Sequence, residues 1–142
     1  MNSAFRIWAS LISLAIIVQV GLAAYGAFNA VDKSDDNGTI GKTAVSDGFN
    51  AHTALGYIIL LAALILLVLA YAGRGTGSPG RLRWSALILG LLVVQVLLAW
   101  AGDATQWLGV LHGMNALAIA GFAGNLAGRE WAAFRGAARP AP

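Results

Sequence analysis

The chain has 142 residues, of which 58% are hydrophobic and only 11% are charged, whereas about a quarter of the residues of an average soluble domain are charged. The absence of cysteine excludes disulfides, thiolate metal sites, iron–sulfur clusters and covalently attached c-type haem. The net charge of +3 does not indicate nucleic-acid binding, because the basic residues stand at the ends of apolar segments and form no stripe among aromatic residues.

Four apolar segments are long enough to cross the hydrocarbon core of a membrane, which takes roughly 20 helical residues. In chain order they cover residues 7–28, 49–71, 84–101 and 107–127. We interpret the first as a membrane span and not as a secretory signal, because its apolar run is longer than a typical signal core. The sequence therefore predicts an all-α membrane protein, with residues 1–142 forming one up-down-up-down four-helix bundle.

The connections between the spans differ in charge. Residues 29–48 form a predicted polar loop with four aspartates and two lysines, and the third connection is very short. All seven arginines lie before the first span, in the second connection or after the fourth span. Because positively charged residues stay on the cytoplasmic side, we expect a multi-pass protein of the bacterial inner membrane with both termini in the cytoplasm.

A motif recurs in the first and third spans. Residues 18–26, VQVGLAAYG, match residues 94–102, VQVLLAWAG, and both fit the pattern Q-x-x-x-A-x-x-G. The span after each motif carries one of the two histidines of the chain, His52 and His112. The chain therefore consists of two copies of a helix pair. Because each pair leaves and returns to the same side, the copies are parallel and related by an axis along the membrane normal.

The two histidines lie at matching depths, a few residues inside the second and fourth spans. An ionisable residue inside a span is costly and indicates function. In an up-down-up-down bundle the second and fourth helices lie on a diagonal of about 11–14 Å. That gap suits two imidazoles with a planar macrocycle between them and is wide for direct contact of the rings. We predict that His52 and His112 bind the iron of one haem b per chain.

Small and polar residues complete the predicted site. Thin helix faces beside the histidines suit a flat cofactor and are provided by Gly56, Gly109 and Gly113. Gln19 and Gln95 are expected to hydrogen-bond across the bundle and set its register, or else to place their amides beside the cofactor. Asn50 and Asn115 could orient an imidazole N–H, and helix capping or bonding between helices would explain them equally well. A zinc or copper ion is disfavoured, because two histidines without nearby carboxylates or thiolates leave its coordination incomplete.

The Q-x-x-x-A-x-x-G helix followed by a histidine helix, twice over, resembles one four-helix half of the haem A synthase family. The resemblance covers nearly the whole chain and implies such a bundle, with His52 and His112 as haem ligands near the outer face. The catalytic half of that family has a glutamate three residues before its first histidine. This chain has Phe49 at that position, and it has Gly109 at the corresponding position before His112. This departure argues against haem A synthesis. The pieces H-x-x-x-G-Y and L-H-x-x-N-A are also similar to small uncharacterised bacterial membrane proteins.

These patterns favour a cytochrome b that transfers electrons or holds haem for a redox partner or a larger membrane complex, with the propionates directed toward Lys33 or Lys42. The alternatives are a cofactor-free accessory subunit of such a complex and a binder of a quinone or another small molecule. Transport is not expected, because no span carries a carboxylate, arginine or lysine in its middle. The spacing of Gly124 and Gly128 suits either an oligomer or tight packing within one bundle.

Overall fold

The computed structural model describes residues 2–34, 38–76 and 78–137. Four long helices dominate these ranges, with one short 3-10 helix before the last of them. They are α1 (Asn2–Asp32), α2 (Lys42–Ala72), α3 (Arg81–Ala101), η1 (Gly102–Ala104) and α4 (Gln106–Ala137). Each of the four α-helices is long and apolar enough to cross a membrane. The predicted all-α four-helix bundle is confirmed.

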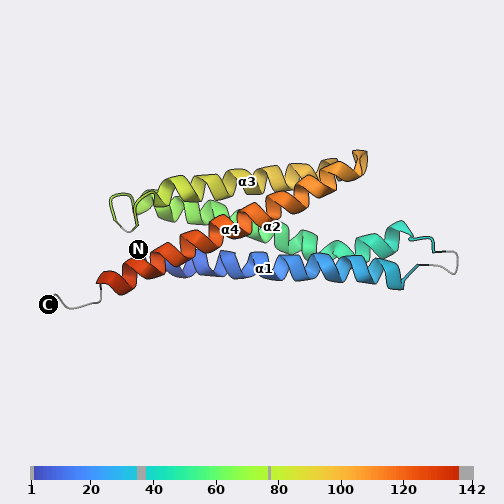
Figure 1. The fold of residues 1–142 in the computed structure, drawn as a ribbon, viewed down its shortest axis with the longest axis horizontal. Helices are drawn as coiled ribbons and strands as arrows, with labels where there is room; N and C mark the ends of the chain where they lie inside the picture. Colours follow the sequence, from blue (N-terminus) through green and yellow to red (C-terminus); the bar gives the residue numbers. More distant parts are fainter. Residues whose placement is uncertain (1, 35–37, 77, 138–142) are drawn as a thin grey trace.

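The helices run up-down-up-down (Figure 1). Each helix packs against the next in the chain and α1 also packs against α4, so that α2 and α4 face each other across a diagonal, as predicted. The α2–α3 connection lies at the end where α1 begins and α4 ends, which we call the terminal end. The α1–α2 connection and η1 lie at the opposite end, which we call the histidine end because the histidine-bearing halves of α2 and α4 belong to it.

The prediction of a loop over residues 29–48 was wrong, because α1 continues to Asp32 and α2 already begins at Lys42. Hydropathy identifies only the apolar part of a helix, and the backbone remains helical beyond it wherever packing supports it. A very close contact supplies that packing here. An added Cβ on Gly48 would lie 2.7 Å from the carbonyl oxygen of Gly26, so only glycine permits this approach of α1 and α2. Near it, Nδ2 of Asn29 donates to the carbonyl oxygen of Ala44 over 3.2 Å.

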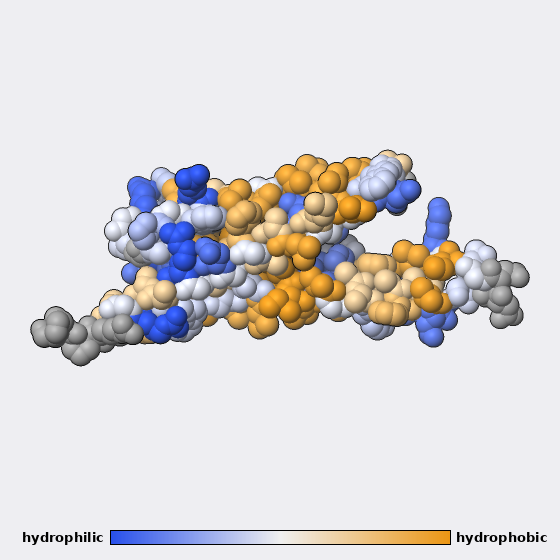
Figure 2. Space-filling view, viewed as in Figure 1, coloured by the Kyte–Doolittle hydropathy of each residue, from blue (hydrophilic) through white to orange (hydrophobic). Residues whose placement is uncertain are grey.

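The buried core follows the sequence repeat along the whole bundle. Residues 76 apart in α1 and α3, and 60 apart in α2 and α4, occupy equivalent places. The buried equivalent pairs are Ile12 and Ile88, Ile16 and Leu92, Ile59 and Ile119, Ala63 and Ala123, and Leu66 and Leu126. On the outside, large apolar side chains are exposed, and Figure 2 shows hydrophobic residues across the middle of the molecule with hydrophilic residues toward its ends. This distribution suits a protein surrounded by lipid.

Contacts between helices follow the same repeat. Nε1 of Trp8 donates to the carbonyl oxygen of Ala62 over 2.8 Å. At the equivalent place in the second copy, the Trp84 ring packs against Phe122, with 5.6 Å between ring centres and 43° between ring planes. Both tryptophans pack their indoles against the neighbouring helix, which adds a structural role to the interfacial one that their positions near span ends suggest. The repeat found in two short motifs therefore extends over both helix pairs.

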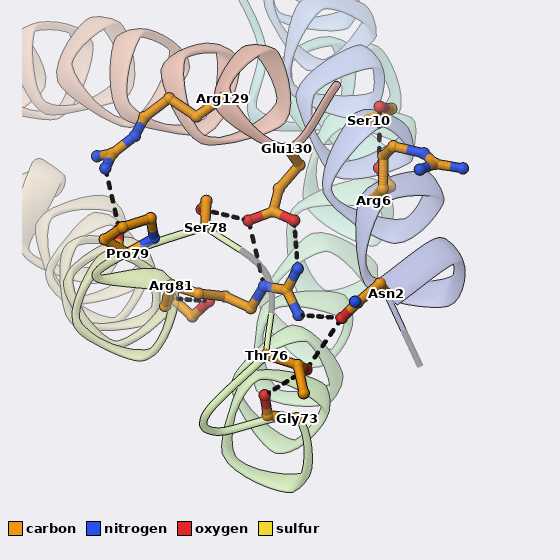
Figure 3. A network of polar contacts seen from close by, with 11 residues as sticks. Asn2, Arg6, Ser10, Gly73, Thr76, Ser78, Pro79, Arg81, Arg129 and Glu130 are labelled. Carbon is orange, nitrogen blue, oxygen red and sulfur yellow. Dashed lines mark hydrogen bonds and ion pairs between the residues drawn. The ribbon is translucent and has the colours of Figure 1, made fainter. Parts of the chain in front are cut away.

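A buried ion pair between Arg81 and Glu130 closes the terminal end (Figure 3). Nε of Arg81 donates to Oε1 of Glu130 over 3.1 Å, Nη2 donates to Oε2, and the Ser78 hydroxyl also donates to Oε1. Nη1 of Arg81 donates to Oδ1 of Asn2 over 3.1 Å, and the Thr76 hydroxyl donates to the same oxygen. These bonds join the start of α1, the α2–α3 connection and α4.

The two copies of the helix pair differ at this ion pair. The residues equivalent to Arg81 and Glu130 in the first copy are Phe5 and Ala70, both fully apolar and both buried. Arg81 and its equivalent Phe5 touch each other, with the guanidinium carbon 4.2 Å from the centre of the phenyl ring. A polar contact in one copy therefore stands where the other copy has apolar packing.

Candidate functional site

A cavity of about 690 Å³ lies between the four helices toward the histidine end. Its volume falls within the ~300–1,000 Å³ of pockets that hold small molecules and cofactors. The two helix pairs diverge toward this end in Figure 1, and the surface between them is hollowed in Figure 2. The residues predicted to bind a cofactor all line the cavity: Gln19, His52, Gly56, Gln95, Gly109, His112 and Gly113.

The two imidazole rings approach each other inside this cavity. Their centres are 6.3 Å apart and their planes are inclined by 54°. Two imidazoles bound on opposite sides of one metal ion, with metal–nitrogen bonds of about 2.0–2.1 Å, have ring centres roughly 6 Å apart. The diagonal of about 11–14 Å expected from the sequence refers to helix axes, and the side chains of His52 and His112 reach inward from them. The separation of the rings therefore suits one metal ion between them.

Each histidine is fixed by the glutamine of a neighbouring helix through two hydrogen bonds, an arrangement that we call a Gln–His clamp. Nδ1 of His52 lies 3.1 Å from the carbonyl oxygen of Gln19, and Nε2 of Gln19 donates to the carbonyl oxygen of His52 over 2.7 Å. The clamp of His112 and Gln95 has the same two bonds, at 3.1 and 3.0 Å.

The clamps decide which nitrogen of each imidazole is available to a ligand. A carbonyl oxygen only accepts hydrogen bonds, so Nδ1 of His52 and of His112 carries the proton. Nε2 of each neutral ring then keeps its lone pair, which is the state in which histidine binds a metal. Both clamps therefore prepare a metal-binding nitrogen at the cavity.

The clamp explains the Q-x-x-x-A part of the repeated motif. A helical side chain lies over the turn before its own Cα, so the residue four positions after each glutamine covers the region of the glutamine carbonyl. Ala23 and Ala99 occupy these positions and line the cavity. Their small side chains leave room for an imidazole to reach the carbonyl oxygen. The sequence identified the glutamines as residues that bond across the bundle, but not the backbone carbonyl as the partner of the histidine.

Asn115 bonds to the neighbouring helix α3. Its Nδ2 donates to the carbonyl oxygen of Leu91 over 2.9 Å and to Oε1 of Gln95 over 2.7 Å. Of the roles that the sequence left open for Asn115, the structure has the bond between helices and not a direct bond to an imidazole. Asn115 supports His112 through Gln95 instead, because it fixes the amide that completes the clamp.

The cavity-lining glycines serve two purposes. An added Cβ on Gly109 or Gly113 would meet no heavy atom within 4 Å, so these residues keep the cavity open along α4. An added Cβ on Gly56 would lie 3.1 Å from Nε2 of Gln19. Gly56 therefore leaves room for the Gln19 amide in the clamp of His52, and Gly109 and Gly113 leave room for a cofactor.

Phe49 closes the place in the first copy that Gly109 leaves open in the second. An added Cβ on Gly26 would lie 2.9 Å from the Phe49 ring, so the ring packs directly on α1. The same ring stands edge-on to His52, with 6.0 Å between ring centres and 88° between planes. The two copies therefore differ at this place, because Gly109 lines the cavity and the Phe49 ring packs on α1 instead.

The site offers a metal two donors, the imidazoles of His52 and His112. In the part of the chain that the structure describes, no group of three or more His, Cys, Asp or Glu side chains could hold a metal ion. Two imidazoles alone leave a bare ion short of ligands. A porphyrin supplies four further nitrogens in one plane, so that two axial imidazoles complete a six-coordinate iron. The site residues fit haem and do not fit a bare ion.

Comparisons with known proteins give no match: no family model, no curated protein and no solved structure matches this chain.

The two clamps differ in one bond, which predicts unequal effects of substitution. Oε1 of Gln95 accepts from Asn115, whereas Oε1 of Gln19 is buried without a partner among the described residues. Gln95→Leu removes the clamp bond and deprives Asn115 of an acceptor, and should lower the free energy of unfolding by about 2–3 kcal/mol. Gln19→Leu also removes an unsatisfied acceptor and should cost about 1 kcal/mol or less. SDS-induced unfolding of detergent-solubilised protein measures both, and equal losses would contradict this reading of the clamps.

Proposed function

We propose that the protein is a membrane-bound cytochrome that binds one haem b between His52 and His112 and transfers single electrons. The observation that carries the proposal is the pair of clamped imidazoles, 6.3 Å apart, in a cavity formed by four apolar helices. A lone membrane histidine usually serves helix packing. Two equivalent histidines, each with Nδ1 bonded to a backbone carbonyl, are better explained as a ligand pair.

The residues around the site suit electron transfer better than chemistry on a bound substrate. His52 and His112 would both hold the iron of the haem, and the haem would supply one-electron chemistry at this site. The clamps hold the two imidazoles in place, and the mostly apolar lining of the cavity lowers the polarity around the site, which would tune a reduction potential. Phe49 stands three residues before His52 and Gly109 three residues before His112, and neither side chain offers a carboxylate for catalysis.

The proposal includes a location and an orientation. The six arginines among the described residues lie near the start of α1, in or just after the α2–α3 connection, or near the end of α4, which places them toward the terminal end. Positively charged residues mark the cytoplasmic side of a bacterial inner membrane. The haem would then lie near the outer face, with Lys33, just after α1, and Lys42, the first residue of α2, as candidates to receive the propionates. A redox partner or a larger complex would approach from that face, and a role in holding haem for such a partner belongs to the same proposal.

Absorption spectroscopy tests the proposal. Protein purified in mild detergent and supplied with haem b should show a Soret band and an α-band in the reduced-minus-oxidised spectrum. The double variant His52→Ala/His112→Ala should lose both bands, whereas Thr53→Ala, a matched change beside His52 in the cavity lining, should keep them. Wild-type protein without these bands would favour a cofactor-free accessory subunit or a quinone binder. Bands that survive in the double variant would contradict the ligand assignment.

A further inference from the structure

The two halves of the site are not equally supported, although their clamps are alike. Asn115 on α4 has Leu55 as its equivalent on α2. Asn115 donates to both Gln95 and the carbonyl oxygen of Leu91, and thereby fixes the amide that completes the clamp of His112. Leu55 offers no hydrogen bond, and Oε1 of Gln19 is buried without a partner among the described residues. Both clamps have their two bonds, but the amide of Gln19 lacks the further bond from an asparagine that holds the amide of Gln95. We call the clamp of His52 incomplete for this reason.

The incomplete clamp favours movement of Gln19. A buried acceptor without a donor raises the energy of the arrangement that holds it there. Rotation of the Gln19 amide relieves that cost but breaks the bond from Nε2 of Gln19 to His52, so the two effects oppose each other within one clamp. Gly56 leaves room for such a rotation, because it has no side chain beside Nε2 of Gln19. The clamp of His112 has no comparable conflict, because both polar atoms of the Gln95 amide, Nε2 and Oε1, are hydrogen-bonded.

The contact of Phe49 does not compensate for the missing bond. Its ring meets His52 edge-on, which limits the orientation of the imidazole, but a phenyl ring has no donor for Oε1 of Gln19. The only described hydrogen bond of the His52 ring is the one from Nδ1 to the Gln19 carbonyl oxygen. The position of His52 thus depends on the less stable of the two clamps.

We propose that the two histidines are unequal ligands: His112 is the fixed ligand and His52 the exchangeable one, which a small neutral ligand of ferrous haem replaces. This inference rests on the proposed haem-binding function. In the exchange, the bond between iron and Nε2 of His52 breaks and a bond between iron and the incoming ligand forms. No electron or proton is transferred. Carbon monoxide is the probe of this ligand class, and Asn115 is the positioning residue that makes the difference.

Single-ligand variants test the inequality directly. After reconstitution with haem b and reduction with dithionite, His52→Gly should keep most of its haem and bind carbon monoxide within the mixing time. His112→Gly should retain little haem. Equal haem content in the two variants would overturn the proposal.

The rate of carbon monoxide binding tests the role of the amide network. In the wild type this rate should become independent of carbon monoxide concentration at high concentration, because release of His52 limits it. Leu55→Asn supplies the missing donor and should slow the reaction roughly five- to tenfold, the effect of one net hydrogen bond. The matched double variant Leu55→Asn/Asn115→Leu, which exchanges the two side chains without changing composition, should transfer the exchangeable role to His112. An unchanged rate in Leu55→Asn would overturn the proposal.

A measurement without haem separates this inference from the proposed function. Nitrogen-15 NMR of the haem-free protein in detergent reports how fast the Nδ1 proton of each imidazole exchanges with water. The proton of His52 should exchange several-fold faster than that of His112, and the order should reverse in the double variant. If the two protons exchange at unequal rates but the protein takes up no haem, the proposed cytochrome function is rejected and the inequality of the clamps stands. Equal exchange overturns the inequality whether or not haem binds.

Discussion

Replacing Glu130 by alanine is expected to lower the free energy of unfolding by about 3–5 kcal/mol, because the change leaves the charge of Arg81 buried without its partner. Only 4% of each residue is exposed, so water cannot take over the missing interaction. The loss also removes the acceptor of Ser78 and loosens the connection between α4 and the α2–α3 loop. SDS-induced unfolding of the detergent-solubilised protein measures the effect.

The first copy of the repeat provides the matched control. Phe5 and Ala70 occupy the places equivalent to Arg81 and Glu130. The double variant Arg81→Phe/Glu130→Ala replaces the ion pair with the apolar pair that the protein already uses there. Apolar residues often substitute for a buried ion pair at little cost, but the Ser78 hydroxyl still loses its acceptor, so the stability should lie about 1–2 kcal/mol below the wild type and clearly above Glu130→Ala. A double variant as unstable as Glu130→Ala would show that the charged pair itself is needed.

The second large effect is expected from Gly113→Leu, which should reduce bound haem to less than one tenth of the wild-type amount. Gly113 follows His112 and lines the cavity, and an added Cβ there meets no atom within 4 Å. The leucine side chain can therefore enter the cavity without unfolding the bundle, and it occupies the space of a planar cofactor. The ratio of Soret to protein absorbance after reconstitution measures haem content.

Gly90→Leu on α3 is the control for helix propensity and added bulk. Gly90 is also helical, also has open space at its Cβ position, and does not line the cavity. Its haem content should equal that of the wild type. If both leucine variants lose haem equally, the loss does not come from filling the cavity. If Gly113→Leu keeps its haem, the cofactor does not lie beside His112.

Much of the architecture follows from sequence because a membrane limits the choices. Apolar length predicts four helices, alternating direction follows from short connections, and the position of the histidines along α2 and α4 places them in the same end of the bundle. The extent of α1 and α2 could not be predicted, because polar residues after Phe28 suggest a loop. Their helical state depends on the close packing of Gly26 against Gly48, which involves two distant segments.

The candidate site was predicted in composition but not in detail. Matching motifs identified both histidines and both glutamines, since equivalent residues in a repeat occupy equivalent places. The bond from each imidazole to a backbone carbonyl leaves no trace in side-chain identity except the alanine four residues after the glutamine. The difference between Leu55 and Asn115 was visible in the sequence, but its meaning depends on Oε1 of Gln95 lying within reach of Asn115. Arg81 was interpreted only as one of the basic residues beside the spans, because its pairing with Glu130 joins the start of α3 to a residue 49 positions later on α4.

The positions where repeat-equivalent residues meet carry a consequence for the origin and redesign of the fold. His52 lies beside its own equivalent His112 at one end, and Phe5 touches its own equivalent Arg81 at the other. Self-contact of equivalent residues is the hallmark of a two-fold homodimer interface. A single two-helix peptide with one glutamine and one histidine would hold half of this site, and two identical copies would complete it. Joining them in one chain allows each half to mutate independently, and Asn115, Gly109 and Glu130 are positions where the two halves differ.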